Sequence, residues 1–157
     1  MPYLNKEFLS YKKFSSATIN DLFGKDKLNK AKTKKVMELR SCIFENLGDG
    51  TFKKRPLPLM AQASQVNDIV IEDIDGDAFN DLLIVGNNFE ISTQLGRLDA
   101  LHGLFLKNTQ NGSFESKKVT DLGIFGASKT IESITINGQA CYTIGRNDDS
   151  PIFLFRN

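Results

Sequence analysis

An internal repeat constrains the fold of this 157-residue chain more than any other sequence feature. The segment SCIFENLGDGTF (41–52) aligns without a gap with GLFLKNTQNGSF (103–114), at an offset of 62 residues. The tripeptide IDG (74–76) aligns with ING (136–138) at the same offset. A repeat of this length is typical of an architecture built from one recurring supersecondary unit.

The second half of the repeat aligns with a small deletion. The segment IVGNN (84–88) matches TIGRN (143–147) at an offset of 59, which implies that the second copy lost three residues. A third copy starts at the end of the chain, where IFLFRN (152–157) resembles SCIFEN (41–46). We therefore expect two units and the first strand of another.

Short strands separated by Gly, Asn and Asp make up each unit. The expected strands are 36–46, 51–59, 66–73, 81–87, 103–108, 113–119, 130–136, 140–145 and 151–156. Four strands per unit correspond to one propeller blade. The sequence predicts a mainly β fold of about two four-stranded β-propeller-type blades, in which repeat 1 covers about 41–88, repeat 2 about 103–147 and a partial third strand 151–157.

A complete propeller needs more blades than this chain provides. Closed propellers have roughly four to eight blades. The sequence therefore indicates either a C-terminal fragment of a longer protein or several copies that complete a ring. An open repeat end also exposes unpaired strand edges, through which a homo-oligomer can form.

A short helical segment precedes the repeat and divides the chain into residues 1–35 and 36–157. Apolar residues fall at helical spacing at Leu4, Phe8, Tyr11 and Phe14. Thr18, followed by Asp21, is typical of a helix N-cap with an acidic first turn, and Gly24 is expected to end that helix.

The strongest chemical signal is the loop DIDGDAFND between two predicted strands. Four carboxylates occupy positions 1, 3, 5 and 9 of this loop: Asp73, Asp75, Asp77 and Asp81. Carboxylates this close together repel one another unless they are protonated or neutralised by a cation. Ca²⁺ suits them best, because it takes roughly six to eight oxygen ligands in flexible geometry. The carbonyl oxygen of Phe79, at position 7, is the expected backbone ligand.

The loop departs from the better-known calcium loops. It is not an EF-hand, because its twelfth position is Ile84 rather than Glu and a strand is expected to follow. Position 6, normally Gly, is Ala78, and an alanine at positive φ costs about 1 kcal/mol, so we expect a lowered affinity or a reshaped loop. An acidic turn that binds nothing specific is the alternative. The second copy of the repeat has no carboxylates here, so one site is expected.

The hairpin NLGDGTF (46–52) and the loop DIDGDAFND (73–81) resemble the FG-GAP/VCBS repeats of integrin α-chain propellers and of bacterial surface proteins similar to cartilage acidic protein. The resemblance covers about residues 41–157. It implies a calcium-stabilised β-propeller, extracellular or at the cell surface, that binds proteins or glycans and has no catalytic residues. The calcium ligands that it implies are Asp73, Asp75, Asp77, Asp81 and the carbonyl of Phe79.

These features favour a non-catalytic adhesion or scaffold module. The extended loop 87–103 is the best candidate for a partner surface, with Arg97 and Asp99 as candidate contacts, although a local ion pair between these two is the plainer interpretation. One alternative is a carbohydrate-active hydrolase that uses a carboxylate pair such as Glu72 and Asp81. Another is a module whose only role is self-assembly.

Charge and composition argue against other classes. The net charge is +1, but residues 1–60 carry 13 Lys or Arg against 6 Asp or Glu and residues 61–157 carry 7 against 13, so the halves attract. The six lysines from Lys25 to Lys35 lack the interleaved aromatic residues that are typical of a nucleic-acid site. No apolar run is long enough to span a membrane. The N-terminus, MPYLNKEFLSYKKF, has no signal-peptide pattern.

The two cysteines, Cys42 and Cys141, lie in apolar stretches. We expect two buried thiols, with one long-range disulfide as the alternative in an oxidising compartment. A single histidine and the lack of a CxxC motif argue against a zinc site.

Overall fold

The computed structural model describes residues 4–116 and 122–156, which belong to two compact units, Met1–Leu39 and Arg40–Asn157. The described part of the first unit contains the short helices α1 (Leu4–Glu7), α2 (Tyr11–Ser15), α3 (Ile19–Phe23) and α4 (Lys25–Lys30).

The caps of these helices explain where they begin and end. The Thr18 hydroxyl accepts the Asp21 N–H, and the Asp21 carboxylate accepts the Thr18 N–H at 2.8 Å, so the predicted N-cap of α3 is confirmed. Gly24 ends α3 with a positive φ of 75°. The predicted apolar stripe is split between two helices, because Ser10 caps α2 by accepting the Lys13 N–H.

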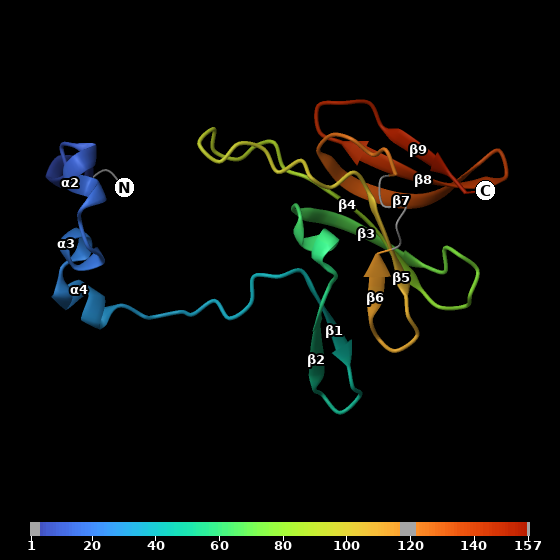
Figure 1. Ribbon diagram of the computed structural model, residues 1–157, viewed down its shortest axis with the longest axis horizontal. Coiled ribbons are helices and arrows are strands. Elements are labelled where there is room, and N and C mark those ends of the chain that lie inside the picture. The colour runs from blue at the N-terminus through green and yellow to red at the C-terminus, as the bar shows by residue number, and fades with distance from the viewer. Residues whose placement is uncertain (1–3, 117–121, 157) are drawn as a thin grey trace. The chain divides into compact units, whose positions relative to one another are not determined.

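The second unit is mainly β, as predicted. Its strands are β1 (Cys42–Asn46), β2 (Phe52–Pro56), β3 (Val66–Glu72), β4 (Asp81–Gly86), β5 (Leu104–Asn108), β6 (Phe114–Ser116), β7 (Ser128–Ile136), β8 (Gln139–Arg146) and β9 (Ile152–Phe155). They form the antiparallel sheets β1-β2, β3-β4-β5-β6 and β7-β8-β9, and the 3-10 helix η1 (Leu59–Gln62) follows β2 (Figure 1). β1 begins later than the predicted strand 36–46, and residues 117–119 of the predicted strand 113–119 lie outside the described residues.

The sheets and the repeat units have different boundaries. The four-stranded sheet joins β3 and β4 of repeat 1 to β5 and β6 of repeat 2, through pairs such as Ile84 with Leu104. Each copy of the repeat thus supplies the last two strands of one sheet and the first two strands of the next. The middle sheet is a four-stranded antiparallel meander, which is compatible with a partial propeller.

The two hairpins of the repeat are equivalent at the level of single hydrogen bonds. Asn46 pairs with Phe52 across β1 and β2, as Asn108 pairs with Phe114 across β5 and β6. Both Asn side chains accept the N–H two residues further on, at 2.9 Å for Asn46 and 2.8 Å for Asn108. The alignment at offset 62 therefore describes a structural repeat.

Strand pairing corrects the alignment of the second half of the repeat. Ile69 pairs with Ile84 in β3 and β4, and Ile131 pairs with Ile144 in β7 and β8, after a bulge at the same place in each sheet. Ile144 therefore corresponds to Ile84, so the offset is 60 rather than 59, and two residues are missing rather than three. The sequence alignment slipped because it matched a glycine to a glycine.

The last strand is shifted by one residue in the same way. Ile144 pairs with Ile152 in β9 as Ile84 pairs with Leu104 in β5. Ile152 thus corresponds to Leu104, and three positions further on Phe155 corresponds to Lys107.

β4 lies between two apolar cores and is buried along its whole length. Leu82 and Ile84 belong to one core, and Leu83 and Val85 belong to the other, because successive side chains of a strand point to opposite faces. The first core includes Leu57 and Ala61 from the segment after β2, and the second includes Ile131, Tyr142 and Ile144 from the third sheet. The middle sheet is therefore covered on both faces, like a blade between its neighbours.

Both cysteines are free thiols. Cys141 is buried in β8, as predicted, whereas Cys42 is only half-buried in β1. The structure thus contains the two separate thiols and not the alternative disulfide.

Asp68 joins the second sheet to the third. Its Oδ2 accepts the Thr130 hydroxyl at 2.8 Å and the Ile131 N–H at 2.9 Å. Burial on its own raises the pKa of Asp68, but the hydrogen bonds from Ile131 and Thr130 together outweigh it and hold the pKa below its usual value.

Because the pKa of Asp68 is lower in the folded state, its contribution to the free energy of unfolding depends on pH. Stability from such a group is present above the pKa of the unfolded chain and is lost as the pH falls through the lower pKa of the folded state. We expect Asp68→Asn to lower the free energy of unfolding by about 1 kcal/mol at neutral pH and to flatten its decline between about pH 5 and pH 2. Urea unfolding at each pH measures this, and an unchanged slope in the variant would contradict it.

Candidate metal site in the acidic loop

The acidic loop, residues 73–81, connects β3 to β4. In the third sheet the corresponding connection between β7 and β8 is a tight turn at Asn137 and Gly138, both at positive φ. Counted between the equivalent pairs, Glu72 with Asp81 and Ile134 with Cys141, the acidic loop has two residues more. Cys141 stands at the position of Asp81, so the third sheet lacks the carboxylate that closes the loop.

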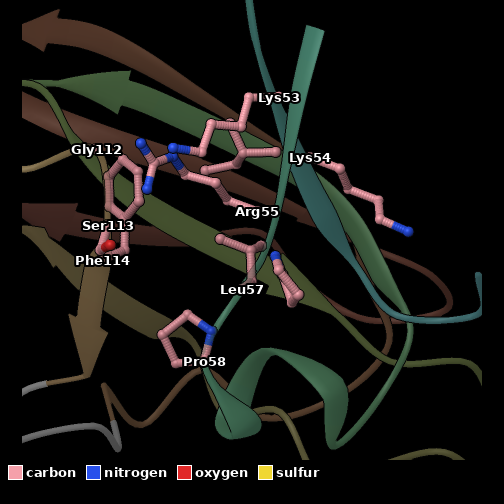
Figure 2. A pocket seen from close by; sticks show the side chains of 10 residues that line it. Lys53, Lys54, Arg55, Leu57, Pro58, Gly112, Ser113 and Phe114 are labelled. Carbon is pink, nitrogen blue, oxygen red and sulfur yellow. The ribbon is translucent and has the colours of Figure 1, made fainter.

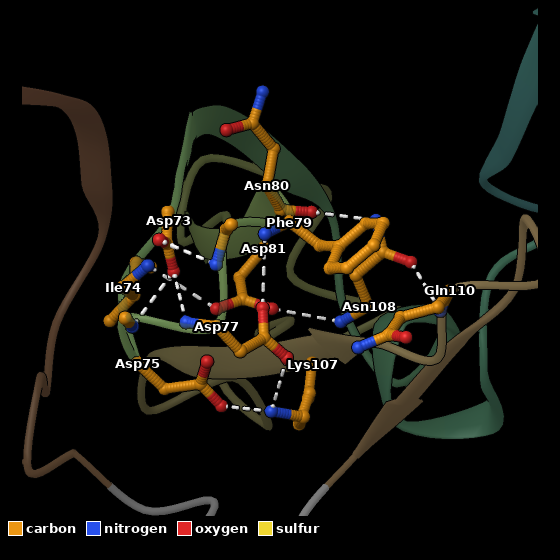
Figure 3. A network of polar contacts seen from close by, with 12 residues as sticks. Asp73, Ile74, Asp75, Asp77, Phe79, Asn80, Asp81, Lys107, Asn108 and Gln110 are labelled. Atoms are coloured by element: carbon orange, nitrogen blue, oxygen red, sulfur yellow. Dashed lines mark hydrogen bonds and ion pairs between the residues drawn. The ribbon is translucent and has the colours of Figure 1, made fainter.

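The Asp73 carboxylate organises the loop. Its Oδ1 accepts the N–H groups of Gly76 at 2.8 Å and Asp77 at 3.0 Å, and its Oδ2 accepts the Ala78 N–H at 2.9 Å (Figure 3). Three backbone donors therefore converge on one side chain, which is how an aspartate at the start of a turn fixes the turn. The loop is preorganised by its own first residue.

The Asp81 carboxylate lies at the bottom of the loop and is fully buried. Its Oδ1 accepts the Asn108 N–H at 2.8 Å, and its Oδ2 accepts the Ile74 N–H at 3.3 Å. A buried charge is tolerated only with such partners. Each oxygen still has a lone pair to offer, since an ionised carboxylate has about four acceptor positions.

Lys107, on β5, projects between Asp75 and Asp77. Its Nζ donates to Asp77 Oδ2 at 2.7 Å and also contacts Asp75 Oδ2. The bond from Lys107, with a further bond from the Phe79 N–H, lowers the pKa of Asp77, and the Asp75 and Asp77 carboxylates raise the pKa of Lys107. Asp77 and Lys107 are therefore both charged at neutral pH.

The structure brings together three of the five predicted ligands. Asp73, Asp75 and Asp81 each offer a carboxylate oxygen, and these oxygens lie within 4.8 Å of one another. Among the described residues Asp77 is not part of that group, and its carboxylate oxygens accept the Phe79 N–H and the Lys107 ammonium group. Ala78 has the positive φ that was expected at position 6, at 70°.

Phe79 lies on the exposed side of the loop, where its side chain is 41 % exposed. Its N–H donates to Asp77 Oδ1 at 3.0 Å. Its role as a backbone ligand through the carbonyl oxygen stays a prediction.

Sequence reasoning missed the partners that other strands bring to the loop. Lys107 and Asn108 come from β5, and Arg156 follows β9. Arg156 bonds to the Glu72 carboxylate at 2.6 Å and to the Asp73 carbonyl at 3.0 Å. No local pattern marks these residues. Lys107 and Asn108 reach the loop through the pairing of β4 with β5, and Arg156 reaches it because the third sheet packs against the second.

The other candidate residues have different surroundings. Glu72 is paired with Arg156, and Asp81 is fully buried. The Arg97 guanidinium lies 4.9 Å from the centre of the Phe89 ring. Among the described residues no ion pair joins Arg97 to Asp99, and both are exposed.

A separate groove of about 310 Å³ lies between β2 and the turn that joins β5 to β6 (Figure 2). It is lined by residues 53–58 on one side and by residues 112–114 on the other. The Arg55 guanidinium packs beside Gly112, and Arg55 Nε donates to the Glu45 carboxylate at 2.8 Å. The charge of this arginine is therefore already paired within the β1-β2 hairpin.

No helix in the described part of the chain is long and apolar enough to cross a bilayer. Comparisons with protein-family models, with curated proteins and with solved structures found no match to this chain. Any functional inference therefore depends on the sequence and on the geometry of the acidic loop.

Proposed function

We propose that the Arg40–Asn157 unit is a calcium-stabilised binding module of the FG-GAP/VCBS kind, and that it is not an enzyme. The observation that carries the proposal is the convergence of Asp73, Asp75 and Asp81, whose carboxylate oxygens lie within 4.8 Å of one another. Carboxylate oxygens on a flexible loop are the ligands that Ca²⁺ prefers. Backbone bonds already hold Asp73 and Asp81 in place, so an ion would bind a largely formed site.

The role of calcium in this proposal is structural. An ion at the loop would join the start of the loop at Asp73 to the first residue of β4 at Asp81. It would thereby fix the β3-β4 connection at one end of the middle sheet. No group of a substrate is activated, because the site consists of carboxylates that are buried, bonded to backbone N–H groups or paired with Lys107.

Binding of a protein or glycan is proposed for the loop between β4 and β5. Asn87 fixes the two ends of this loop, since its side-chain amide donates to the Leu101 carbonyl at 2.7 Å and its Oδ1 accepts the Leu101 N–H at 3.0 Å. The Asn88–Leu98 bridge ties the loop again further out. Arg97 and Asp99 are thus displayed on an anchored loop, and a place outside the cell or on its surface is part of the same proposal.

A calcium-dependent stability measurement tests the metal site. We expect excess calcium to raise the free energy of unfolding of the wild-type protein by about 2.7 kcal/mol at a hundred times the dissociation constant, because a ligand that binds only the folded state stabilises it by mass action. Asp75→Ala should lose most of this increment, since it removes one of the three converging carboxylates.

The matched control is Asp49→Ala, in the turn between β1 and β2. The Asp49 carboxylate accepts the Thr51 N–H and hydroxyl, so its loss should act equally in calcium and in excess chelator. Thermal unfolding followed by circular dichroism, with each protein in calcium and in chelator, provides the comparison. A wild-type protein whose stability is the same in both would refute the calcium site.

A further inference from the structure

The ammonium group of Lys107 already occupies one side of the acidic loop. It donates to Asp77 at 2.7 Å and contacts Asp75 Oδ2, and the Lys107 side chain is only 21 % exposed (Figure 3). Asp75 is also one of the three carboxylates that converge for an ion. A cation of the protein and a cation from solution would therefore share one ligand.

The repeat shows that this lysine accompanies the acidic loop. Glu45 takes the position of Lys107 in β1, because Glu45 pairs with Lys53 as Lys107 pairs with Glu115. Phe155 takes the same position in β9, in the sheet whose β7-β8 turn is short. Because the equivalent positions hold Glu45 and Phe155, the strand itself does not require a lysine here. We therefore attribute the presence of Lys107 to the acidic loop beside it.

A divalent ion and the ammonium group cannot both hold Asp75 at full strength. Both are positive, and each would be held by the Asp75 carboxylate, so binding of one weakens binding of the other. The Lys107 side chain is long and flexible and lies at the partly exposed edge of the loop. Its ammonium group can therefore move into solvent while the backbone of β5 stays in place.

We propose that Lys107 is a tethered counter-cation, which holds Asp75 and Asp77 when no metal is bound and is displaced when a divalent cation binds. This inference rests on the calcium site proposed above. It has two consequences. The loop stays folded without metal, and the affinity for calcium is lower than the carboxylates alone would give, because the metal must first free them.

The first test compares the wild-type protein with Lys107→Met, which keeps an unbranched, flexible side chain and removes the ammonium group with its charge. Calcium binding is measured by titration calorimetry on the full chain. We expect the variant to bind calcium about tenfold more tightly, as for a site that is free only about a tenth of the time in the wild type. In excess chelator the variant should be less stable than the wild type. Lys107→Arg, which keeps the charge, is the matched control and should not gain affinity.

A second measurement uses the wild-type protein alone and so does not depend on the folding of a variant. An amine-reactive label, read by mass spectrometry, should modify Lys107 up to about tenfold faster in calcium than in chelator, because the ammonium group that was free about a tenth of the time is then released into solvent. Lys129, which is exposed and outside the loop, should react equally in both conditions.

The outcomes separate the two proposals. If the wild type and Lys107→Met bind calcium equally, or if the labelling rate of Lys107 does not change, the displacement is wrong and the calcium site stands. If neither protein binds calcium, the metal site is wrong, and Lys107 is then a permanent ion-pair partner of the loop.

Discussion

Replacing Gly86 with alanine is expected to destabilise the β-repeat unit by about 3 kcal/mol or more. A Cβ atom at this position would lie 1.9 Å from the Gln65 carbonyl oxygen and 3.0 Å from Leu101 Cδ2. The carbonyl cannot retreat easily, because it accepts the Asn87 N–H at 3.0 Å. The close approach of two backbone segments is therefore possible only with glycine, at a point where β4 is buried on both faces.

Gly145→Ala is the matched control, in the neighbouring strand position of the third sheet. There a Cβ atom would meet only the Thr130 methyl group, at 2.9 Å, and a side chain can rotate away where a backbone carbonyl cannot. We expect Gly145→Ala to lower the free energy of unfolding by about 1 kcal/mol or less. Urea unfolding followed by circular dichroism compares the two variants, and equal midpoints would show that the backbone contact at Gly86 does not limit the packing.

The turns explain why so much of the β-structure could be predicted. In each hairpin two Asn or Asp side chains accept the backbone N–H two residues further along the chain: Asn46 and Asp49 in the first, Asn108 and Asn111 in the second. Local chemistry of this kind is visible in a sequence. The acidic loop was visible for the same reason, since Asp73 bonds to N–H groups within five residues of itself.

The grouping of strands into sheets could not be predicted in this way. A repeat defines which strands recur but not where one sheet ends and the next begins, and here each copy spans two sheets. Both faces of β4 are covered by a core, so its sequence is a continuous apolar run rather than an alternation of apolar and polar residues. Such a run does not indicate which strands pair with β4. Lys107 went unrecognised because its contact with Asp75 depends on the pairing of β4 with β5.

Asn87→Ala is the second change for which we expect a loss of about 3 kcal/mol or more. The Asn87 side chain is 1 % exposed and donates to the Leu101 carbonyl at 2.7 Å and the Gly126 carbonyl at 3.0 Å, while it accepts the Leu101 N–H. Removing it leaves three polar backbone groups without these partners beside a core. Asn87 also has φ of 87°, a conformation that asparagine tolerates better than alanine.

Asn147 occupies the corresponding place in the third sheet and provides the control. The backbone N–H groups of Asn87 and Asn147 make equivalent bonds, to the Gln65 and Ala127 carbonyls. The Asn147 side chain, however, is exposed and donates to the Glu90 carboxylate at 2.9 Å. Asn147→Ala should therefore cost less than about 1 kcal/mol. The two positions share the backbone N–H bond but not the positive φ of Asn87, so the difference between the variants reports the loss of the buried amide together with that backbone strain.

The two variants should also differ in the loop proposed to bind partners. Because Asn87 ties the start of this loop to Leu101 at its end, its loss releases residues 88–100 even where the sheets stay folded. We expect trypsin to cleave after Arg97 faster in Asn87→Ala than in Asn147→Ala, at a temperature well below unfolding. Asn147 bonds to Glu90 of the same loop, so equal cleavage rates would mean that the buried amide holds the loop no better than this exposed bond does, and that it stabilises the sheets without shaping the surface.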